Sequence, residues 1–340
     1  MKKFYADYLR FAKQLANERG GNVFLEDRME KDQISVTPYI YNACSANCQF
    51  CSEMLVRSGS VTVCNGICAD YAEKFRKVLE HIKETPIFLS LSGKEPTESK
   101  DQLRIILDIA KKFQEEGGVI TEKVMYTNLS GFAKDYNGLI ETLKGHQITR
   151  IECSRHHYDE EKNQWIVRFK KNAGEIEPIK RNDVFTDVVK RLNEAIPVRM
   201  VAVLQGKGIH NVAGIIEYLR FAEAMGVTDV VFRELAMFDE IVDHGKTRQY
   251  IEENRIELMD ILEALPDEQF KLDNIIKGYY YFSFGYKYAG KINVSFEMSD
   301  YEEMIKYHGN MDDKKIYKLI YYPNGILCKD WNMKGKLDWV

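Results

Sequence analysis

The chain lacks long hydrophobic runs and has no marked excess of either charge. No stretch of its 340 residues approaches the roughly 18 consecutive apolar residues of a membrane-spanning helix. Its formal net charge is −4, with acidic and basic residues well mixed along the chain. We therefore expect no membrane segment, and no dominant surface for binding nucleic acid.

An export signal, a fixed-period repeat and a low-complexity segment are also absent from the sequence. After its first lysines, the N-terminal segment places Tyr8, Phe11 and Leu15 at helical spacing with charged residues between them, which indicates an amphipathic helix rather than a secretory signal. The seven cysteines are an odd number in a chain with no such signal. We therefore expect a cytoplasmic protein whose cysteines are thiols or metal ligands.

What the sequence does contain is an alternation of strand-like and helix-like segments. The strand-like segments are rich in β-branched residues, as a parallel sheet buried on both faces requires. They are 34–42, 87–93, 122–128, 149–155, 197–205 and 228–235. The helical segments lie near 69–83, 99–115, 132–144, 183–195, 211–225 and 249–264, with Gly226 where a helix would end. The pattern predicts an α/β fold, a partial (β/α)6 TIM-like barrel with its chemistry at the carboxyl ends of the strands.

Two segments depart from this alternation. Residues 156–181 are long, charged and weakly periodic, so they form either an inserted loop over the strand ends or a solvated excursion. After residue 268 the chain becomes tyrosine-rich and strand-like, with Asn324-Gly325 as a hairpin turn. We expect this tail to be a small α+β extension whose Tyr279–Tyr281 and Trp331 pack on the barrel and partly cap its mouth. The expected units are an N-terminal helical segment 1–33, the barrel 34–265 and the extension 266–340.

The most informative stretch follows the first strand and carries three cysteines. Cys44, Cys48 and Cys51 lie within eight residues of loop, close enough for three thiolates to meet at one metal centre. A [4Fe–4S] cluster has four irons, so three cysteines leave one iron open to a small molecule. The alternatives are a structural zinc knuckle or buried free cysteines, but no fourth zinc ligand lies nearby in this loop.

The spacing of these cysteines, with Phe50 just before the third, resembles the CxxxCxxC signature of the radical S-adenosylmethionine (radical SAM) family. The second strand ends in Ser92-Gly93-Lys94-Glu95-Pro96, which is similar to the GGEP motif of that family, with Ser92 and Lys94 as departures. The resemblance implies that Gly93, Glu95 and Pro96 contact SAM, with Glu95 accepting from its ammonium group. The alternative for Glu95 is an ordinary carboxylate in the first turn of a helix.

Further strand ends resemble the same family, and in particular its molybdenum-cofactor GTP-cyclising subgroup. Thr127-Asn128 is similar to the start of a TNG segment, although Leu129 replaces the glycine. Ser154-Arg155 stands where the family places a ribose contact and a partner of the SAM carboxylate. The remaining matches to that subgroup are Gln205, Asn211 and Arg233-Glu234. The resemblance covers roughly residues 34–235.

The resemblance implies an enzyme in which a reduced cluster cleaves SAM to a 5′-deoxyadenosyl radical, which then abstracts a substrate hydrogen. The expected cofactors are one [4Fe–4S] cluster and SAM, and the expected electron donor is a carrier such as flavodoxin or ferredoxin. A second cluster on Cys64, Cys68 and Cys328 is not expected, because subfamilies with auxiliary clusters have denser C-terminal cysteines; buried structural cysteines are the alternative.

Two further candidates lie at the end of the fourth strand. A Cys153 thiol facing the barrel could return a hydrogen atom to a substrate radical, but Cys153 and Ser154 point opposite ways in a regular strand, and a packed cysteine is the alternative. His156-His157 could bind a metal, although adjacent histidines on a loop more often contact substrate, backbone or water.

The substrate is left open between two hypotheses. The first is a peptide or natural-product precursor; the second is a sugar, nucleotide or other small metabolite that is epimerised, dehydrogenated or rearranged. The sequence does not distinguish an oxidoreductase from an isomerase or a lyase. A different class, a non-catalytic iron–sulfur or zinc-binding protein, is disfavoured by Gly93, Glu95, Pro96, Ser154 and Arg155, which such a protein would not need.

Overall fold

The computed structural model describes residues 5–18, 24–27, 33–40, 43–51, 67–236, 245–310, 316–329, 331 and 335–339. Cys64 lies outside these ranges, so its predicted role is not addressed. No helix among the described residues combines the length and apolar character needed to cross a bilayer.

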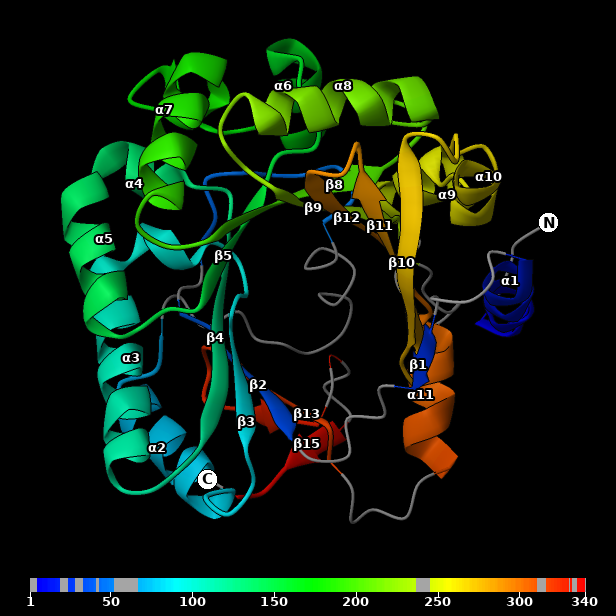
Figure 1. The fold of residues 1–340 in the computed structure, drawn as a ribbon. Helices are drawn as coiled ribbons and strands as arrows, with labels where there is room; N and C mark the ends of the chain where they lie inside the picture. The colour runs from blue at the N-terminus through cyan, green and yellow to red at the C-terminus, as the bar shows by residue number, and fades with distance from the viewer. Residues whose placement is uncertain are drawn as a thin grey trace.

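Six parallel strands form the centre of the molecule (Figure 1). They are β2 (Ile34–Pro38), β3 (Ile87–Leu91), β4 (Ile120–Thr127), β5 (Arg150–Ser154), β8 (Val198–Leu204) and β9 (Asp229–Glu234). Each pairs in parallel with the next in this order. All six predicted strands are therefore present, and the expectation of a partial TIM-like barrel is confirmed.

Helices cover the outer face of the curved sheet (Figure 1). They are α2 (Tyr71–His81), α3 (Lys100–Glu115), α4 (Ser130–Lys134), α5 (Tyr136–Gly145), α7 (Asn182–Asn193), α8 (Val212–Glu223), α9 (Lys246–Asn254) and α10 (Leu258–Glu263). In α3 the buried residues recur at helical spacing, Leu103, Ile106, Leu107, Ala110 and Phe113, so one face packs on the sheet. Two predicted helices, 132–144 and 249–264, are each divided in two. Gly226 follows α8 with a φ of +76°, as a helix-ending glycine should.

The predicted insertion 156–181 folds over the cysteine-bearing loop. It contains α6 (Glu160–Val167), the short strands β6 (Lys171–Asn172) and β7 (Glu175–Ile176), and the 3-10 turn η3 (Pro178–Lys180). Backbone N–H groups of Asn47 and Gln49 donate to the carbonyls of Val167 and Ile166. The insertion thus lies against the strand ends, as the first of its two interpretations proposed.

The C-terminal tail extends the barrel sheet at both of its edges. β10 (Phe270–Lys277), β11 (Tyr281–Tyr288) and β12 (Ile292–Ser299) are antiparallel, and β12 joins β9 in parallel. β1 (Phe24–Asp27) pairs with β10, while β13 (Lys318–Tyr321) pairs with β2. With β14 (Leu327–Cys328) and β15 (Lys336–Leu337), one sheet holds 13 strands within the described ranges, and α11 (Tyr301–Asn310) follows β12. The expected hairpin turn joins β13 to β14, with Gly325 at a φ of +77°.

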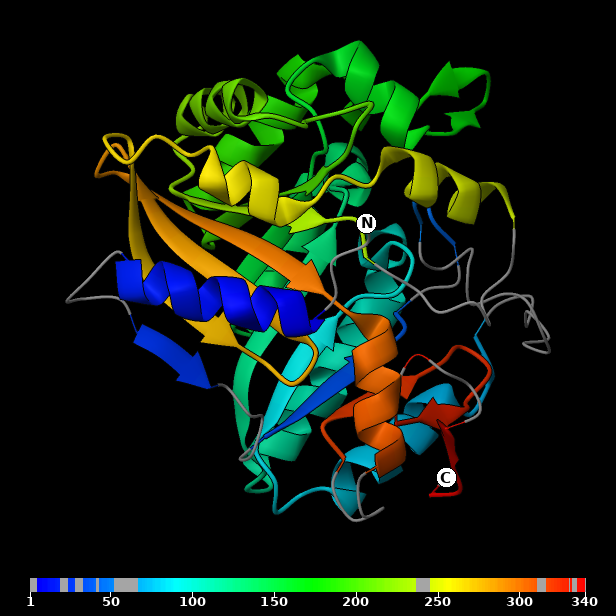
Figure 2. The same cartoon turned by 90° about the vertical axis from the view of Figure 1, so that its right-hand side faces the viewer.

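The N-terminal helix α1 (Tyr5–Glu18) crosses the outer side of this extension (Figure 2). Tyr8 of α1 packs against the rings of Phe282 and Phe284 on β11. Its hydroxyl donates to Glu234 Oε2 at 2.5 Å, and Arg255 forms an ion pair with the same carboxylate. Glu234 thereby ties α1, the end of β9 and the segment between α9 and α10 together.

We predict that Tyr8→Phe lowers the free energy of unfolding by about 1–3 kcal/mol, because a buried carboxylate oxygen loses its donor while the ring packing stays. Urea denaturation measures the change. Tyr136→Phe is the control: its half-buried ring stacks with Arg191, and its change should stay within about 0.5 kcal/mol. Equal effects of the two substitutions would contradict the role assigned to the Tyr8 hydroxyl.

Candidate active site

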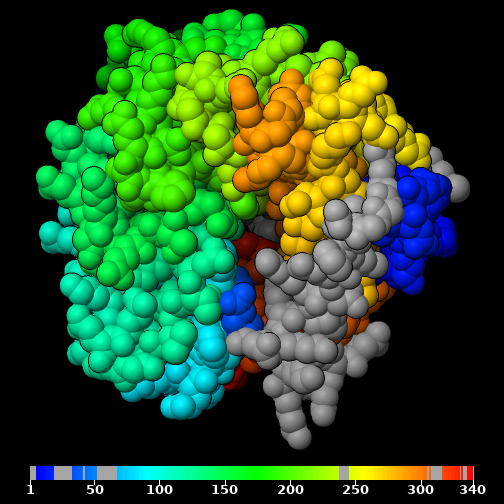
Figure 3. All heavy atoms as spheres, viewed as in Figure 1, coloured from blue at the N-terminus to red at the C-terminus, as the bar shows by residue number. Residues whose placement is uncertain are grey.

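A cavity of about 680 Å³ lies at the carboxyl ends of the parallel strands. Ten of the residues singled out from the sequence line it: Cys44, Cys48, Phe50, Cys51, Gly93, Glu95, Thr127, Asn128, Ser154 and Arg233. Figure 3 views the molecule from the amino ends of these strands, opposite the cavity; on that face the surface is hollowed between the side formed by β3 and β4 and the side formed by β10–β12. The carboxyl ends of parallel strands meet at one edge of a sheet, so these residues converge although they come from five separate segments.

The cysteine loop is held in place from both sides. Lys170 on the insertion donates its backbone N–H to Ser45 O and its ammonium to Cys44 O. From β4, the Asn128 amide donates to Ser45 Oγ at 3.2 Å and to Cys44 Sγ at 3.7 Å. The Ala46 N–H also points at Cys44 Sγ, at 3.4 Å. Donors directed at a cysteine sulfur stabilise its thiolate, the form that binds metal.

The electrostatics of the loop fit a bound cationic centre. Burial, and next the charge of Glu95, raise the pKa of Cys44 to about 12. Burial, and then the neighbouring Cys51 and Cys44, raise the pKa of Cys48 as well. Three thiolates so close together therefore need positive charge among them, which an iron–sulfur cluster provides.

Within the described ranges, no three cysteine, histidine, aspartate or glutamate side chains gather around a single ion. This arrangement is compatible with a cubane, because each cysteine of a [4Fe–4S] site binds a different iron. A single zinc ion would instead require ligands that converge on one point. Three cysteines on one loop are the donor set of a [4Fe–4S] cluster with one open iron, whereas a zinc knuckle takes four ligands.

The Glu95 carboxylate joins the ends of two strands. Its Oε1 accepts from Thr97 N at 3.1 Å, from Thr97 Oγ1 at 2.5 Å and from Thr127 Oγ1 at 2.6 Å, and its Oε2 accepts from Asn128 N at 2.7 Å. Burial raises the pKa of Glu95, and these donors oppose that shift. Glu95 also caps η2 (Pro96–Glu98), so the alternative first-turn role is present together with its place in the cavity wall.

Two positions near the cavity use a left-handed backbone. Gly93 has a φ of +85°, and a β-carbon there would lie 2.7 Å from the ring of Tyr39. Leu129, at the position where the resembled motif has glycine, keeps a φ of +66° and is buried. Leu129 therefore adopts the left-handed backbone conformation that a glycine at this position would favour, and its side chain packs into the core.

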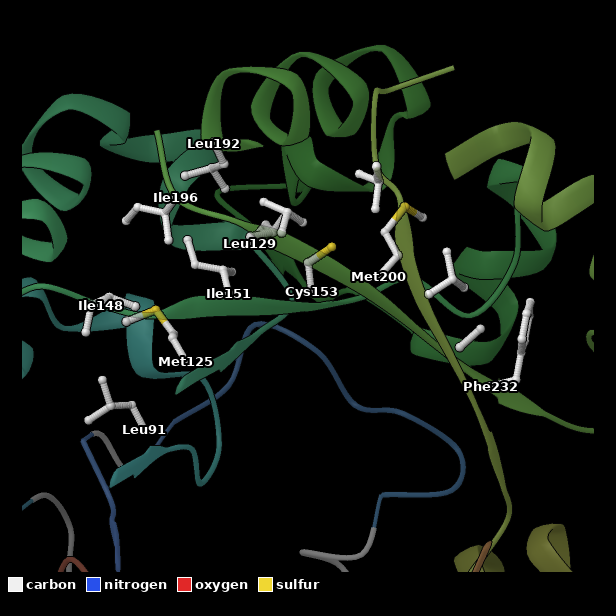
Figure 4. Packing of buried hydrophobic residues seen from close by; sticks show 14 of the residues in the cluster. Leu91, Met125, Leu129, Ile148, Ile151, Cys153, Leu192, Ile196, Met200 and Phe232 are labelled. Carbon is white, nitrogen blue, oxygen red and sulfur yellow. The ribbon is translucent and has the colours of Figure 1, made fainter. Parts of the chain in front are cut away.

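Strand alternation on β5 decides which of four candidates meet the cavity. Ser154 and His156 line it, whereas Cys153 and Arg155 do not. Cys153 is fully buried and packs beside Leu129, Ile151 and Met200 under the helices (Figure 4). Burial raises the pKa of its thiol to about 12. This position corresponds to the packed-cysteine alternative: Cys153 does not line the cavity, where a thiol that returns a hydrogen atom would have to point.

Arg155 also differs from its expected place. Its guanidinium donates to Ile179 O at 3.1 Å and to Lys180 O at 2.9 Å, and it also donates to Asn182 Oδ1. It lies 4.7 Å from the centre of the Phe185 ring. Arg155 therefore fastens η3 and α7 to the end of β5, outside the cavity, and is not placed to bind a SAM carboxylate.

Three weaker candidates also lie outside the cavity wall. Gln205 is fully buried and accepts from Tyr250 OH at 2.5 Å, so its amide is engaged outside the cavity. Pro96 is buried behind Glu95 as the first residue of η2. Asn211 caps α8, accepting from Gly214 N at 2.9 Å. Each of these residues has a structural role here, which their spacing in the sequence did not reveal.

Arg233 lines the floor of the cavity and is held by two carboxylates. Its Nε donates to Glu297 Oε2 at 2.8 Å and its Nη2 to Glu152 Oε2 at 3.0 Å. Glu152 is 2% exposed and also lies near Arg150 and Arg199, so a charged network fills the barrel below the cavity. Glu297 comes from β12 of the tail, so the extension completes the barrel interior.

His156 is a cavity residue that the sequence did not single out beyond a weak metal interpretation. Val203 N donates to its Nδ1 at 3.2 Å, so the ring proton is on Nε2. Its ring meets the Phe50 ring edge-on, with the ring centres 4.8 Å apart. His157 points away from this cavity and accepts from Asp159 N. The two histidines therefore do not act as a pair.

Tyr126, Lys170 and Tyr301 also line the cavity without having been predicted. Tyr126 precedes Asn128 by two residues, so the alternation of side chains along a strand could have identified it. Lys170 and Tyr301 come from segments with no motif.

The remaining cysteines lie away from the cavity. Cys328 is buried among Tyr39, Tyr322 and Trp331, and Cys68 precedes α2 with its N–H donating to Pro323 O. Trp331 thus packs against the barrel edge, in agreement with the expected packing of the aromatic tail.

No family model matches the chain, and no curated protein sequence matches it. Among solved structures, SuiB of Streptococcus suis with bound S-adenosylmethionine aligns with a TM-score of 0.52 and 14% identity, over 95% of this chain and 64% of SuiB. The fold of this chain is thus a partial barrel of the kind found in SuiB. At this identity the likeness establishes the fold alone, and the chain spans less than two thirds of the SuiB length.

Two other structures align less well. One is anSMEcpe with bound AdoMet and a Cp18Cys peptide, with a TM-score of 0.43 and 13% identity over 59% of this chain and 50% of that one. The other is coproporphyrinogen III oxidase (HemN) of Escherichia coli, described as a radical SAM enzyme, with a TM-score of 0.41 and 10% identity over 76% of this chain and 68% of HemN. Of the three structures, SuiB alone supports the fold assignment.

We predict that Gly93→Ala destabilises the protein more than Gly117→Ala. Both glycines have a positive φ, so both substitutions carry backbone strain of about 1–2 kcal/mol. The β-carbon at position 117 meets nothing within 4 Å, whereas the one at 93 meets the Tyr39 ring. The difference between the two unfolding free energies therefore measures this contact. Equal losses would mean that Tyr39 moves aside at no cost.

We also predict that His156 makes stability pH-dependent below neutrality. Burial, followed by the charges of Arg155 and Arg233, lowers the pKa of His156 to about 3. Below about pH 6.5 only the unfolded chain binds a proton here, so the free energy of unfolding falls by up to about 1.4 kcal/mol per pH unit. His156→Gln keeps an acceptor for Val203 N and does not titrate, so it does not lose stability in this way. The amount by which its free energy of unfolding lies below that of wild type should therefore shrink as pH falls from about 7 to about 5. Urea denaturation tests this, with exposed His210→Gln as control; parallel curves for wild type and His156→Gln would refute it.

Proposed function

We propose that the chain is a radical SAM enzyme that cleaves S-adenosylmethionine reductively and uses the resulting 5′-deoxyadenosyl radical to abstract a substrate hydrogen. The observation that carries this proposal is the convergence of Cys44, Cys48 and Cys51 with Glu95 and Asn128 on one cavity at the strand ends. The partial-barrel fold, similar to that of SuiB with bound S-adenosylmethionine, supports it.

In this proposal Cys44, Cys48 and Cys51 hold a [4Fe–4S] cluster with one open iron. When bound, the cluster supplies the electron that breaks the carbon–sulfur bond of SAM. The protein's own residues orient the reactants: Glu95 accepts from the SAM ammonium, Gly93 allows close approach of the backbone, and Phe50 packs beside the nucleoside.

The other cavity residues would complete the site. Ser154 and Thr127-Asn128 line the walls where the SAM ribose would lie, and His156 offers an Nε2–H donor on the same side as Phe50. Arg233, held in place by Glu152 and Glu297, presents a fixed guanidinium at the floor.

For the substrate we propose a peptide or natural-product precursor, in line with the resemblance. The alternative is a sugar, nucleotide or other small metabolite. The electron donor is a one-electron carrier such as flavodoxin or ferredoxin. The domain division into 1–33, 34–265 and 266–340 and a cytoplasmic location also stay predictions.

The decisive test replaces the three cysteines together with alanine. After anaerobic reconstitution with iron and sulfide, wild type should bind about four irons per chain, as one cubane requires, and convert SAM to 5′-deoxyadenosine with dithionite. The variant should lose both. Iron content and electron paramagnetic resonance report the cluster, and mass spectrometry reports the nucleoside.

Cys153→Ala is the matched control, since Cys153 is a buried cysteine outside the cavity. It should keep the iron, the resonance signal and 5′-deoxyadenosine formation. If wild type binds zinc and leaves SAM intact, the non-catalytic metal-binding alternative is correct instead. Iron well above four per chain would point to Cys64, Cys68 and Cys328 as a second site.

A further inference from the structure

The cysteine loop borders a surface whose charge suits an acidic partner. Four residues of the insertion form this surface, here called the basic rim: Trp165, Arg168, Lys170 and Lys171. They occupy the end of α6 and the start of β6, on the segment that folds over the loop.

Three residues of the basic rim form hydrogen bonds with the cysteine loop. Gln49 Nε2 donates to Trp165 O at 2.9 Å, and Arg168 Nε donates to Asn47 O at 2.8 Å. Lys170 Nζ donates to Cys44 O at 2.6 Å. The rim therefore lies directly against the cysteine loop.

The rim carries unbalanced positive charge. Arg168, Lys170 and Lys171 are exposed, and in the described part of the chain none of them forms an ion pair. Of the acidic residues on the insertion, Glu161 pairs with Lys180 and Glu177 with Lys134, whereas Glu175 on β7 is exposed; the three cations of the rim still outnumber it. Unpaired cations on one patch attract a partner of opposite charge and speed its approach.

The rim also has an apolar contact point. Trp165 is 48% exposed, and the centre of its ring lies 6.0 Å from the centre of the Tyr250 ring. An exposed tryptophan on the same short segment as three cations matches the composition of protein interfaces, in which tryptophan and arginine are enriched.

We propose that the basic rim is the docking surface for a small acidic electron-carrier protein, which delivers the electron required by the cluster. This inference rests on the proposed function, in which the chain itself supplies no electron. One electron passes from the reduced carrier to the cluster, so the carrier is oxidised by one electron and the cluster is reduced by one. A carrier seated on the rim lies against the cysteine loop, which keeps the transfer distance short.

The test compares two single charge reversals in the reconstituted protein. Lys171→Glu reverses an exposed rim charge whose side chain forms no hydrogen bond or ion pair with the described residues, so folding should be unaffected. Lys111→Glu makes the same change on exposed α3, away from the rim. Each variant is assayed for 5′-deoxyadenosine formation, once with dithionite and once with an acidic flavodoxin kept reduced by its reductase and NADPH.

With limiting flavodoxin, Lys171→Glu should lower the rate by about tenfold at low salt, and the loss should shrink as ionic strength rises. Its dithionite rate should match wild type, and Lys111→Glu should behave as wild type with both reductants. An unchanged flavodoxin rate in Lys171→Glu, or the same loss in both variants, would overturn the docking surface.

Binding provides a second measurement that does not depend on catalysis. Oxidised flavodoxin should bind immobilised wild-type protein, and it should bind Lys171→Glu and Trp165→Ala more weakly, by surface plasmon resonance. If dithionite yields no 5′-deoxyadenosine in wild type, the proposed function fails. If dithionite works but flavodoxin neither binds at the rim nor depends on it, only the docking inference fails.

Discussion

The buried carboxylate of Glu95 is the interaction on which the arrangement of the site depends. Its two oxygens accept from both residues that close the cavity on β4, Thr127 and Asn128, while its own N–H donates to Ala43 O beside the first cysteine. Because a buried carboxylate without donors is costly, these bonds hold the ends of β3 and β4 and the cysteine loop in one position. The residue proposed to bind SAM is thus also the residue that assembles its pocket.

A second constraint is the charge balance around the cysteines. Burial disfavours thiolates at Cys44 and Cys48, yet a backbone amide and an asparagine amide point at Cys44, and Lys170 and Arg168 lie near the loop. The insertion that supplies these cations has no motif of its own. It acts through its position: it covers the loop and places Arg168 and Lys170 against the loop carbonyls.

Much of the barrel could be predicted from the sequence, because parallel strands buried on both faces appear as β-branched runs and the helices between them as amphipathic stretches. The tail could be predicted only as local strands. Its strands join both edges of the barrel sheet, at β9 and at β2, and bring Glu297 beside Arg233. Such pairings join residues far apart in the chain, and no local pattern encodes them.

The sequence by itself determined the position of the cysteine loop, the segment at the end of β3 and the order of six strands, since these depend on residue type and spacing within short segments. Only the tertiary structure decided which face each side chain takes. On β5, Ser154 and His156 meet the cavity while Cys153 and Arg155 pack outward, because successive side chains alternate and one residue of register exchanges the two sets. That register is fixed by hydrogen bonds to β4 and β8, strands that the local sequence of β5 does not contain.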